Sequence, residues 1–179
     1  LGSIYACYVN RDHLKSYNLE DPAELVDSLE WTFDKFFEMC REVYADENGN
    51  GIKDHDGVNG DLFSHVTSKT RTDAWYYATG ARYCGSDKNG AITVSPTYNS
   101  DKVITAAASL AEHFGNSGNG FIADKTTVPI HAFAGGSALF MTETLGAALE
   151  DVVQTSEGLN FSIIPLPKYD KSQEKYLSV

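Results

Sequence analysis

The chain has 179 residues, enough for one domain with a sizeable core, and 42% hydrophobic and 22% charged residues are typical of a water-soluble globular protein. Its 14 Lys and Arg against 25 Asp and Glu give a net charge of -11, which repels phosphate backbones and anionic lipid surfaces. Nucleic acid is therefore not an expected partner. The ten Tyr, nine Phe and two Trp supply aromatic rings that suit ligands with apolar faces, such as sugars.

Neither the cysteines nor the apolar runs indicate a compartment. Cys7, Cys40 and Cys84 have no paired or metal-like spacing, and an odd number cannot form a closed disulfide framework. No apolar run approaches the length of a membrane span, and the first residues lack the regions of a signal peptide. Apolar and aromatic residues at both ends lead us to expect a piece of a longer protein.

Strands and helices alternate in the first half of the sequence. Residues 3–9 predict a strand, and Asp21 followed by Pro22 begins a short helix. Thr32 caps a second helix, whose apolar residues keep helical spacing as far as Tyr44. A strand over 61–66 and a helix over 71–80 follow.

The second half continues the alternation. Residues 81–95 predict a hairpin around the turn Asp87–Gly90, and Ser100 begins a helix that ends at Gly115. Residues 115–125, with three glycines, predict a flexible loop, and a short helix lies around 129–135. The last elements are a strand over 137–142, a helix from Glu143 to about Val153 and a strand over 160–167. The alternation indicates an α/β fold.

Three stretches, in order, resemble the extracellular solute-binding proteins of ABC importers. The stretch "YVNRDHLKSYNLEDPAELVDSLEWTFDKFFEMCREVYADENGNGIKD" matches the order Y-N-K-D, D-P, W-T-W/F-D-K and D-x-N-G-D-G. The stretches "FAGGSALFMTETLGAALEDV" and "LNFSIIPLPKYDKSQEKYLS" match F-x-x-G-x-A-x-F with its helix and F-G-I-x-P-L-P-K-x-D. The sequence differs from the pattern at Leu29, where glycine is usual, and at Val9, where tyrosine is common.

The resemblance implies a periplasmic-binding-protein-like type II fold. Such proteins have two α/β lobes with the ligand between them. By that likeness residues 1–179 are an incomplete second lobe, cut at the crossovers between the lobes. The resemblance also implies a non-catalytic protein outside the cell, either periplasmic or a lipoprotein on the cell surface. Its lipid anchor would lie outside this segment, and its partners would be a sugar or oligosaccharide and an ABC permease.

The stretch 44–60 resembles a calcium loop with the pattern D-x-[DN]-x-[DN]-G. Alternate oxygens can converge on a hard cation when a glycine permits a sharp turn. The candidate ligands are Asp46, Asn48, Asn50, the carbonyl of Ile52, and Asp54. The twelfth position is Gly57 where a bidentate carboxylate usually stands, with Asp56 one place before it. The stretch therefore indicates either a weak, structural calcium site or plain Asn-Gly turns.

Two groups of residues are candidates for ligand contact. By the resemblance, the end of the strand 137–142 and the helix after it contact ligand through Thr142, Glu143 and Thr144. We expect Glu143 to be exposed in the first helical turn, where it can accept hydrogen bonds from hydroxyl groups. The cluster Trp75, Tyr76 and Tyr77 offers rings for stacking on a sugar, although helical spacing directs part of it into the core.

No catalytic constellation is present. Ser137 lies outside a G-x-S-x-G motif, and the five histidines are scattered without metal-ligand spacing. We expect non-catalytic capture of a carbohydrate and its delivery to an ABC permease. The alternative is an extracellular carbohydrate-active or adhesive module stabilised by calcium.

Overall fold

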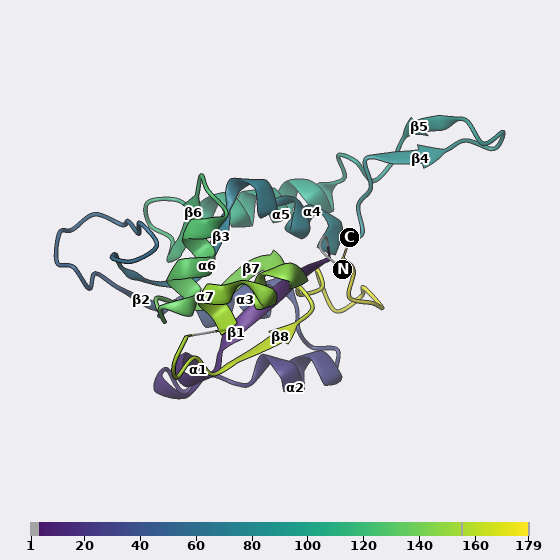
Figure 1. Cartoon of the computed structure of the whole chain (residues 1–179). Coiled ribbons are helices and arrows are strands. Elements are labelled where there is room, and N and C mark those ends of the chain that lie inside the picture. Colours follow the sequence, from purple (N-terminus) through teal and green to yellow (C-terminus); the bar gives the residue numbers. More distant parts are fainter. Residues whose placement is uncertain (1–3, 155, 179) are drawn as a thin grey trace.

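The computed structural model describes residues 4–154 and 156–178, so Ser3, where the first predicted strand begins, lies outside the described part. Helices and strands alternate along most of the sequence (Figure 1). The strands are β1 (Tyr5–Asn10), β2 (Tyr44–Ala45), β3 (Leu62–Ser68), β4 (Cys84–Ser86), β5 (Ile92–Val94), β6 (Gly120–Ala123), β7 (Ala138–Thr144) and β8 (Phe161–Ile164). The α-helices are α1 (Arg11–Ser16), α2 (Pro22–Asp27), α3 (Phe33–Cys40), α4 (Asp73–Ala78), α5 (Asp101–His113), α6 (Thr127–Ala134) and α7 (Asp151–Gln154). Two 3-10 helices complete the described elements, η1 (Lys69–Arg71) and η2 (Leu145–Leu149).

A mixed six-stranded sheet forms the centre of the lobe. Its order is β2-β3-β7-β1-β8, and β6 also pairs with β3. Strands β3, β6 and β7 are parallel to one another, whereas β1 runs antiparallel to both β7 and β8. The parallel pairs need crossovers, which the intervening helices supply.

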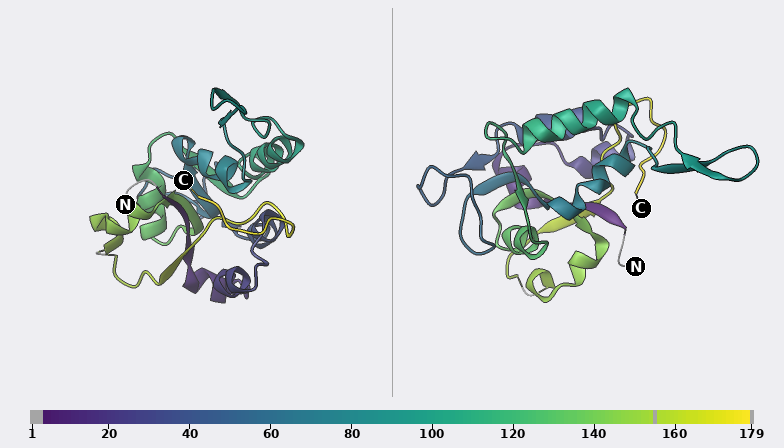
Figure 2. Two further views of the ribbon diagram at one scale, coloured as in Figure 1. Left: turned by 90° about the vertical axis from the view of Figure 1, so that its right-hand side faces the viewer. Right: turned by 90° about the horizontal axis from the view of Figure 1, so that it is seen from above.

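Both faces of the sheet are covered by helices. In β1, Cys7 and Val9 face a core built with α3, α4 and α5, and Ala6 and Tyr8 face a core built with α6, η2 and α7. This alternation follows from the two-residue period of a strand. Figure 2 shows α5 as an outer helix of the first layer. The expected α/β lobe is therefore a three-layer structure.

Helix α2 has the predicted start and an unusual end. Asp21 accepts a hydrogen bond from the backbone N–H of Ala23, and Pro22 occupies the first turn. After the helix, the N–H of Leu29 bonds to the carbonyl of Val26 and the N–H of Glu30 to that of Leu25, a Schellman motif. Leu29 has φ 58°, in the region that favours glycine. The difference from the family pattern at this position therefore places a branched side chain in a strained conformation.

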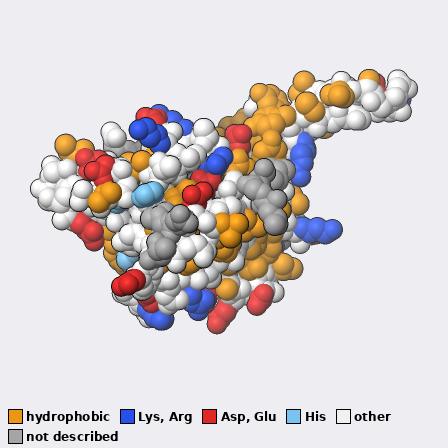
Figure 3. All heavy atoms as spheres, viewed as in Figure 1, with side chains coloured by type: hydrophobic (Ala, Val, Ile, Leu, Met, Phe, Trp, Pro, Cys, Tyr) orange, Lys and Arg blue, Asp and Glu red, His pale blue; other side chains and the backbone are white. Residues whose placement is uncertain are grey.

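The hairpin of β4 and β5 extends away from the body of the lobe (Figure 1). It turns at Asp87–Gly90 as predicted, and the N–H of Asn89 and of Ala91 bond to the Asp87 carboxylate. Tyr83 connects it to α4 by stacking on Tyr76, with ring centroids 4.5 Å apart. Figure 3 shows hydrophobic side chains gathered where the hairpin leaves the body.

Three predictions of local structure were wrong. Helix α3 ends at Cys40, and Tyr44 instead pairs with Phe63 in the sheet. The loop predicted over 115–125 contains β6, a short strand whose pairing with β3 no local pattern reveals. The helix predicted from Glu143 does not begin there, because β7 continues to Thr144 and a 3-10 helix follows.

No helix within residues 4–154 and 156–178 has the length and apolar content to cross a bilayer.

Candidate functional site

The parallel strands end together at one edge of the sheet. Ser68 at the end of β3 is paired with Ala123 at the end of β6, and β7 pairs in parallel with β3 as far as Met141 and ends three residues later at Thr144. In α/β sheets ligands bind in the crevice outside the carboxyl ends of the strands. This edge is therefore the first place to seek a site.

A cavity of about 300 Å³ lies at this edge, and we call it the strand-end pocket. It lies between the segment after β3, the start of α6 and the segment after β7. The residues that line it are Arg71, Thr126, Thr127, Ile130, His131, Glu143, Thr144, Gly146, Ala147 and Glu150. Its charged and hydroxyl side chains come from the last residues of β7, from the segments after β3 and β7, and from α6 with the residue before it.

An ion pair lies in the strand-end pocket. Arg71 donates from Nε to Glu143 Oε1 at 2.5 Å, and the same oxygen accepts from the N–H of Thr144 at 2.8 Å. The Glu143 side chain is only 1% exposed, whereas that of Arg71 is 29% exposed. Glu143 Oε2 is buried and has no hydrogen-bond partner among the described residues. The pocket thus holds a buried carboxylate with half of its acceptor capacity unused.

Two further groups shape the same edge. Lys69 pairs with Asp124 at 2.5 Å, which joins the segments after β3 and β6, and both side chains are exposed. Helix α6 has Thr126 as its N-cap without a side-chain cap, and Thr126 and Thr127 at its start line the pocket. Polar and charged groups from all three segments therefore meet at this edge.

Tyr8 anchors the wall of the pocket that follows β7. Its hydroxyl donates to the carbonyl of Thr144 at 2.8 Å and accepts from the N–H of Ala148 at 3.0 Å. Burial, together with the nearby charge of Glu143, raises the pKa of Tyr8 to about 12. The phenol therefore stays protonated at neutral pH and keeps η2 attached to the end of the strand.

The structure separates the predicted contact residues Thr142, Glu143 and Thr144. Thr142 is fully buried, where its hydroxyl bonds to His65 Nε2 at 2.9 Å. Glu143 and Thr144 line the strand-end pocket. The expectation that Glu143 is exposed in a helical turn was wrong, because Glu143 lies in a strand and is covered by its ion pair with Arg71.

The aromatic cluster Trp75, Tyr76 and Tyr77 does not line the strand-end pocket. Trp75 is fully buried against Phe36, with ring centroids 4.7 Å apart. Trp75 and Tyr76 border an apolar groove of about 370 Å³ between α4 and α5. Tyr77 packs edge-on against Tyr83. The expected stacking platform thus lies apart from the polar pocket, and Trp75 has no exposed ring surface.

The candidate calcium ligands occupy a series of tight turns. Asp46 accepts from the N–H of Gly49 and of Gly51, and Asn48 Nδ2 donates to Asp54 Oδ1 at 3.2 Å. Asn50 accepts from the N–H of Ile52 at 2.6 Å. Within the described ranges no three His, Cys, Asp or Glu side chains are grouped to hold a metal ion. The loop holds its shape through these Asx turns, and their geometry leaves both interpretations of the sequence open.

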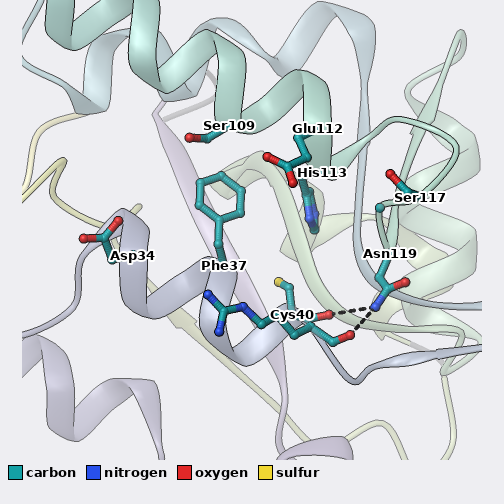
Figure 4. A pocket seen from close by; sticks show the side chains of 10 residues that line it. Asp34, Phe37, Cys40, Ser109, Glu112, His113, Ser117 and Asn119 are labelled. Carbon is teal, nitrogen blue, oxygen red and sulfur yellow. Dashed lines mark hydrogen bonds between the residues drawn. The ribbon is translucent and has the colours of Figure 1, made fainter.

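A larger cavity, of about 480 Å³, lies between α3 and the end of α5 (Figure 4). Asn119 donates there to the carbonyl oxygens of Cys40 and Arg41, and His113 faces the same space. Gly118 and Asn119 precede β6, so this cavity lies at the amino ends of the parallel strands. Because ligands bind at the carboxyl ends of the strands in such folds, the position of this cavity argues against a ligand site there.

Arg71, Thr126 and Thr127 are pocket residues that the sequence did not indicate. The lysine and arginine after β3 belong to a short polar stretch without a motif, and Thr126 and Thr127, at the start of α6, lie next to the segment predicted as a loop. A signal was available for the threonines, because a polar residue before an apolar helix often marks its start. None was available for Arg71.

Comparison with known proteins supports the fold. No protein-family model and no curated protein matches the chain. Among solved structures, UgpB from Mycobacterium tuberculosis in complex with glycerophosphocholine is 18% identical, with a TM-score of 0.57 over 92% of this chain and 36% of that one. MalE from Bdellovibrio bacteriovorus bound to maltotriose is 13% identical, with a TM-score of 0.59 over 98% and 39%. Maltose-bound MalE3 from T. maritima is 15% identical, with a TM-score of 0.62 over 99% and 41%.

These likenesses confirm the predicted fold, a single α/β lobe of the periplasmic-binding-protein kind. The chain spans between 36% and 41% of the length of these solved structures. The three solved structures contain glycerophosphocholine, maltotriose and maltose, respectively. At these identities the comparison establishes the fold alone.

Proposed function

We propose that this chain is one lobe of an extracellular solute-binding protein that captures a carbohydrate and delivers it to an ABC permease, without catalysis. The observation that carries the proposal is the polar strand-end pocket at the carboxyl ends of β3, β6 and β7. It occurs in a fold shared with proteins that are bound to maltose, maltotriose and glycerophosphocholine.

The lobe would supply one wall of a clamshell. In such proteins, closure of two lobes encloses the ligand, and the closed form is what a partner recognises. The strand-end pocket is open on one side, so a second lobe would complete the enclosure. A location outside the cell, in the periplasm or at the surface through a lipid anchor, belongs to the same proposal.

The absence of catalysis in this proposal agrees with the chemistry of the pocket. Glu143 Oε1 is held by Arg71 and by the N–H of Thr144, so this oxygen is committed to fixed hydrogen bonds. His131 lines the same pocket on an exposed turn of α6. An arrangement of fixed donors and acceptors suits recognition, in which binding must be reversible.

Nuclear magnetic resonance titration of the 179-residue protein tests the proposal, because it detects weak binding. D-glucose, maltose and glycerophosphocholine are the probes. We expect shifts of the backbone amides of Thr126, Thr127 and Thr144. The affinity should be low, since one lobe buries only one side of the ligand.

A blocking variant provides the control. Thr127→Trp should fill the pocket and remove the shifts, whereas Thr105→Trp on the exposed side of α5 should leave them unchanged. Shifts confined to other surfaces, or no response to any of the three probes, would argue against this lobe as a carbohydrate-binding wall.

A further inference from the structure

The Arg71–Glu143 pair presents donors and an acceptor side by side. Arg71 uses only Nε in its bond to Glu143, and its remaining N–H groups have no partner among the described residues. Glu143 Oε2 likewise has none. A guanidinium has five N–H donors in a planar fork, and a carboxylate has two acceptor oxygens. Both groups therefore retain hydrogen-bonding capacity toward the pocket.

A vicinal diol matches this arrangement. Each hydroxyl group can donate one hydrogen bond and accept others. One hydroxyl can donate to Glu143 Oε2 while its neighbour accepts from the terminal N–H groups of Arg71. Oε2 is buried in the present structure, so this mode of binding includes a movement of the side chains around the carboxylate, of which Arg71 is the partly exposed one.

The charges at the pocket favour a neutral ligand. Arg71 and Glu143 neutralise each other, and Lys69 and Asp124 do the same beside them. Glu150 adds a negative charge to the lining, which the partial positive charge at the start of α6 offsets only in part. The whole protein carries a net charge of -11. An anionic ligand would therefore meet no net positive charge.

Ring stacking is not available at this wall. The lining residues of the strand-end pocket include no Phe, Tyr or Trp within the described part of the sequence. The exposed rings of Tyr83 and Tyr98 lie instead at the hairpin, where Tyr83 contacts both Tyr76 and Tyr98. Recognition at this lobe thus depends on hydroxyl groups and not on the flat face of a sugar ring.

We propose that the ligand is a neutral polyhydroxy compound that presents a vicinal diol to Arg71 and Glu143, and that Arg71 selects it without ring stacking. This inference rests on the proposed function, and it specifies the ligand class at the same pocket. It implies that an acyclic polyol binds about as well as a ring sugar.

Magnetic resonance titration with three probes tests it: D-glucose, the acyclic polyol D-glucitol and the anionic D-glucose 6-phosphate. D-glucose and D-glucitol should shift the Arg71 Nε–H and Thr144 N–H signals with affinities within about threefold of each other. D-glucose 6-phosphate should bind more weakly than D-glucose.

Two variants locate the contact. Arg71→Lys keeps the charge but removes the planar fork, and it should weaken binding of D-glucose and D-glucitol at least tenfold. Glu143→Gln converts one acceptor into a donor and should have a similar effect. Lys69→Gln, at the same edge but outside the pocket lining, should leave both affinities unchanged. If Glu143→Gln is unfolded, Arg71→Lys alone decides the result.

The outcomes separate this inference from the function on which it rests. Tighter binding of D-glucose 6-phosphate would overturn the neutral-diol inference but keep a carbohydrate site. Binding of D-glucose without D-glucitol, with shifts in the signals of Tyr76 and Tyr77, would overturn the neutral-diol inference in the same way. So would an Arg71→Lys variant that binds D-glucose and D-glucitol with the affinity of the original protein. No binding of any probe at the pocket would overturn the proposed function itself, and the inference with it.

Discussion

The imidazole ring of His65 stacks on that of His113, with ring centroids 5.4 Å apart and an angle of 25° between the planes. Both rings are buried among Phe36, Trp75 and Phe114. His65 Nδ1 and His113 Nε2 have no hydrogen-bond partner among the described residues. The pair is therefore accommodated in its uncharged form.

Acid should destabilise the lobe through this pair. Burial, together with the charge of Lys53, lowers the pKa of His113 from 6.5 to about 4, and burial and His113 lower the pKa of His65. A lowered pKa contributes stability above pH 6.5 that is lost as the pH falls toward about 4. For His113 the full loss is on the order of 3 kcal/mol.

Urea denaturation at a series of pH values from about 7 to about 4 measures this effect. In His113→Gln the side chain is neutral throughout, so the free energy of unfolding should depend less on pH. His131→Gln, at an exposed position of α6, should keep the steeper dependence of the original protein. Equal pH dependence in all three proteins would show that the buried pair is not responsible.

Relief of backbone strain should stabilise the end of α2. Leu29 has φ 58° and is about half exposed. Leu29→Gly should raise the free energy of unfolding by about 1 kcal/mol, because glycine adopts this conformation without a Cβ clash. Leu29→Ala retains the Cβ and should bring no gain. Thermal or chemical denaturation compares the free energy of unfolding of the two variants with that of the original protein. A Leu29→Gly variant less stable than the original protein would contradict the presence of strain at this position.

The Arg71–Glu143 pair should also contribute to stability. An exposed Glu143 would contribute little to stability, but Glu143 is buried and accepts two hydrogen bonds, so Glu143→Gln should lower the free energy of unfolding by about 1–3 kcal/mol. Arg71→Ala leaves a buried carboxylate unpaired and should cost about 2–4 kcal/mol. Lys69→Ala, in the exposed pair, should change stability by less than about 1 kcal/mol. Equal losses for Arg71→Ala and Lys69→Ala would contradict the burial of the pair.

We propose that the loop from Asp46 to Asp54 binds calcium weakly. Millimolar calcium should then raise the melting temperature over that in chelator, because the ion binds only the folded loop. Asp46→Ala should remove the increase. Asp87→Ala breaks a comparable Asx turn in the β4–β5 hairpin, and this variant should retain the increase of the melting temperature in calcium. Calorimetry that finds identical melting in calcium and chelator would leave the loop as a series of turns.

Local signals in the sequence were sufficient for elements that depend on near neighbours. Thr32 caps α3 and accepts from the N–H of Lys35, and Asp87 closes the hairpin turn through bonds within four residues. The alternation of side chains between the two faces of β1 likewise follows from the strand itself. The cap at Thr32 and the turn at Asp87 were predicted because each is stabilised by contacts inside one short segment.

The residues of the strand-end pocket depend on partners far away in the sequence. The sequence by itself determined an α/β lobe, its caps and the position of its turns. Only the tertiary structure decided that β6 forms beside β3, that β7 continues through Glu143, and that Arg71, 72 residues away, pairs with that carboxylate. The reason is physical: a four-residue strand and a buried charge have no stability without their partners, and those partners meet only when the sheet assembles.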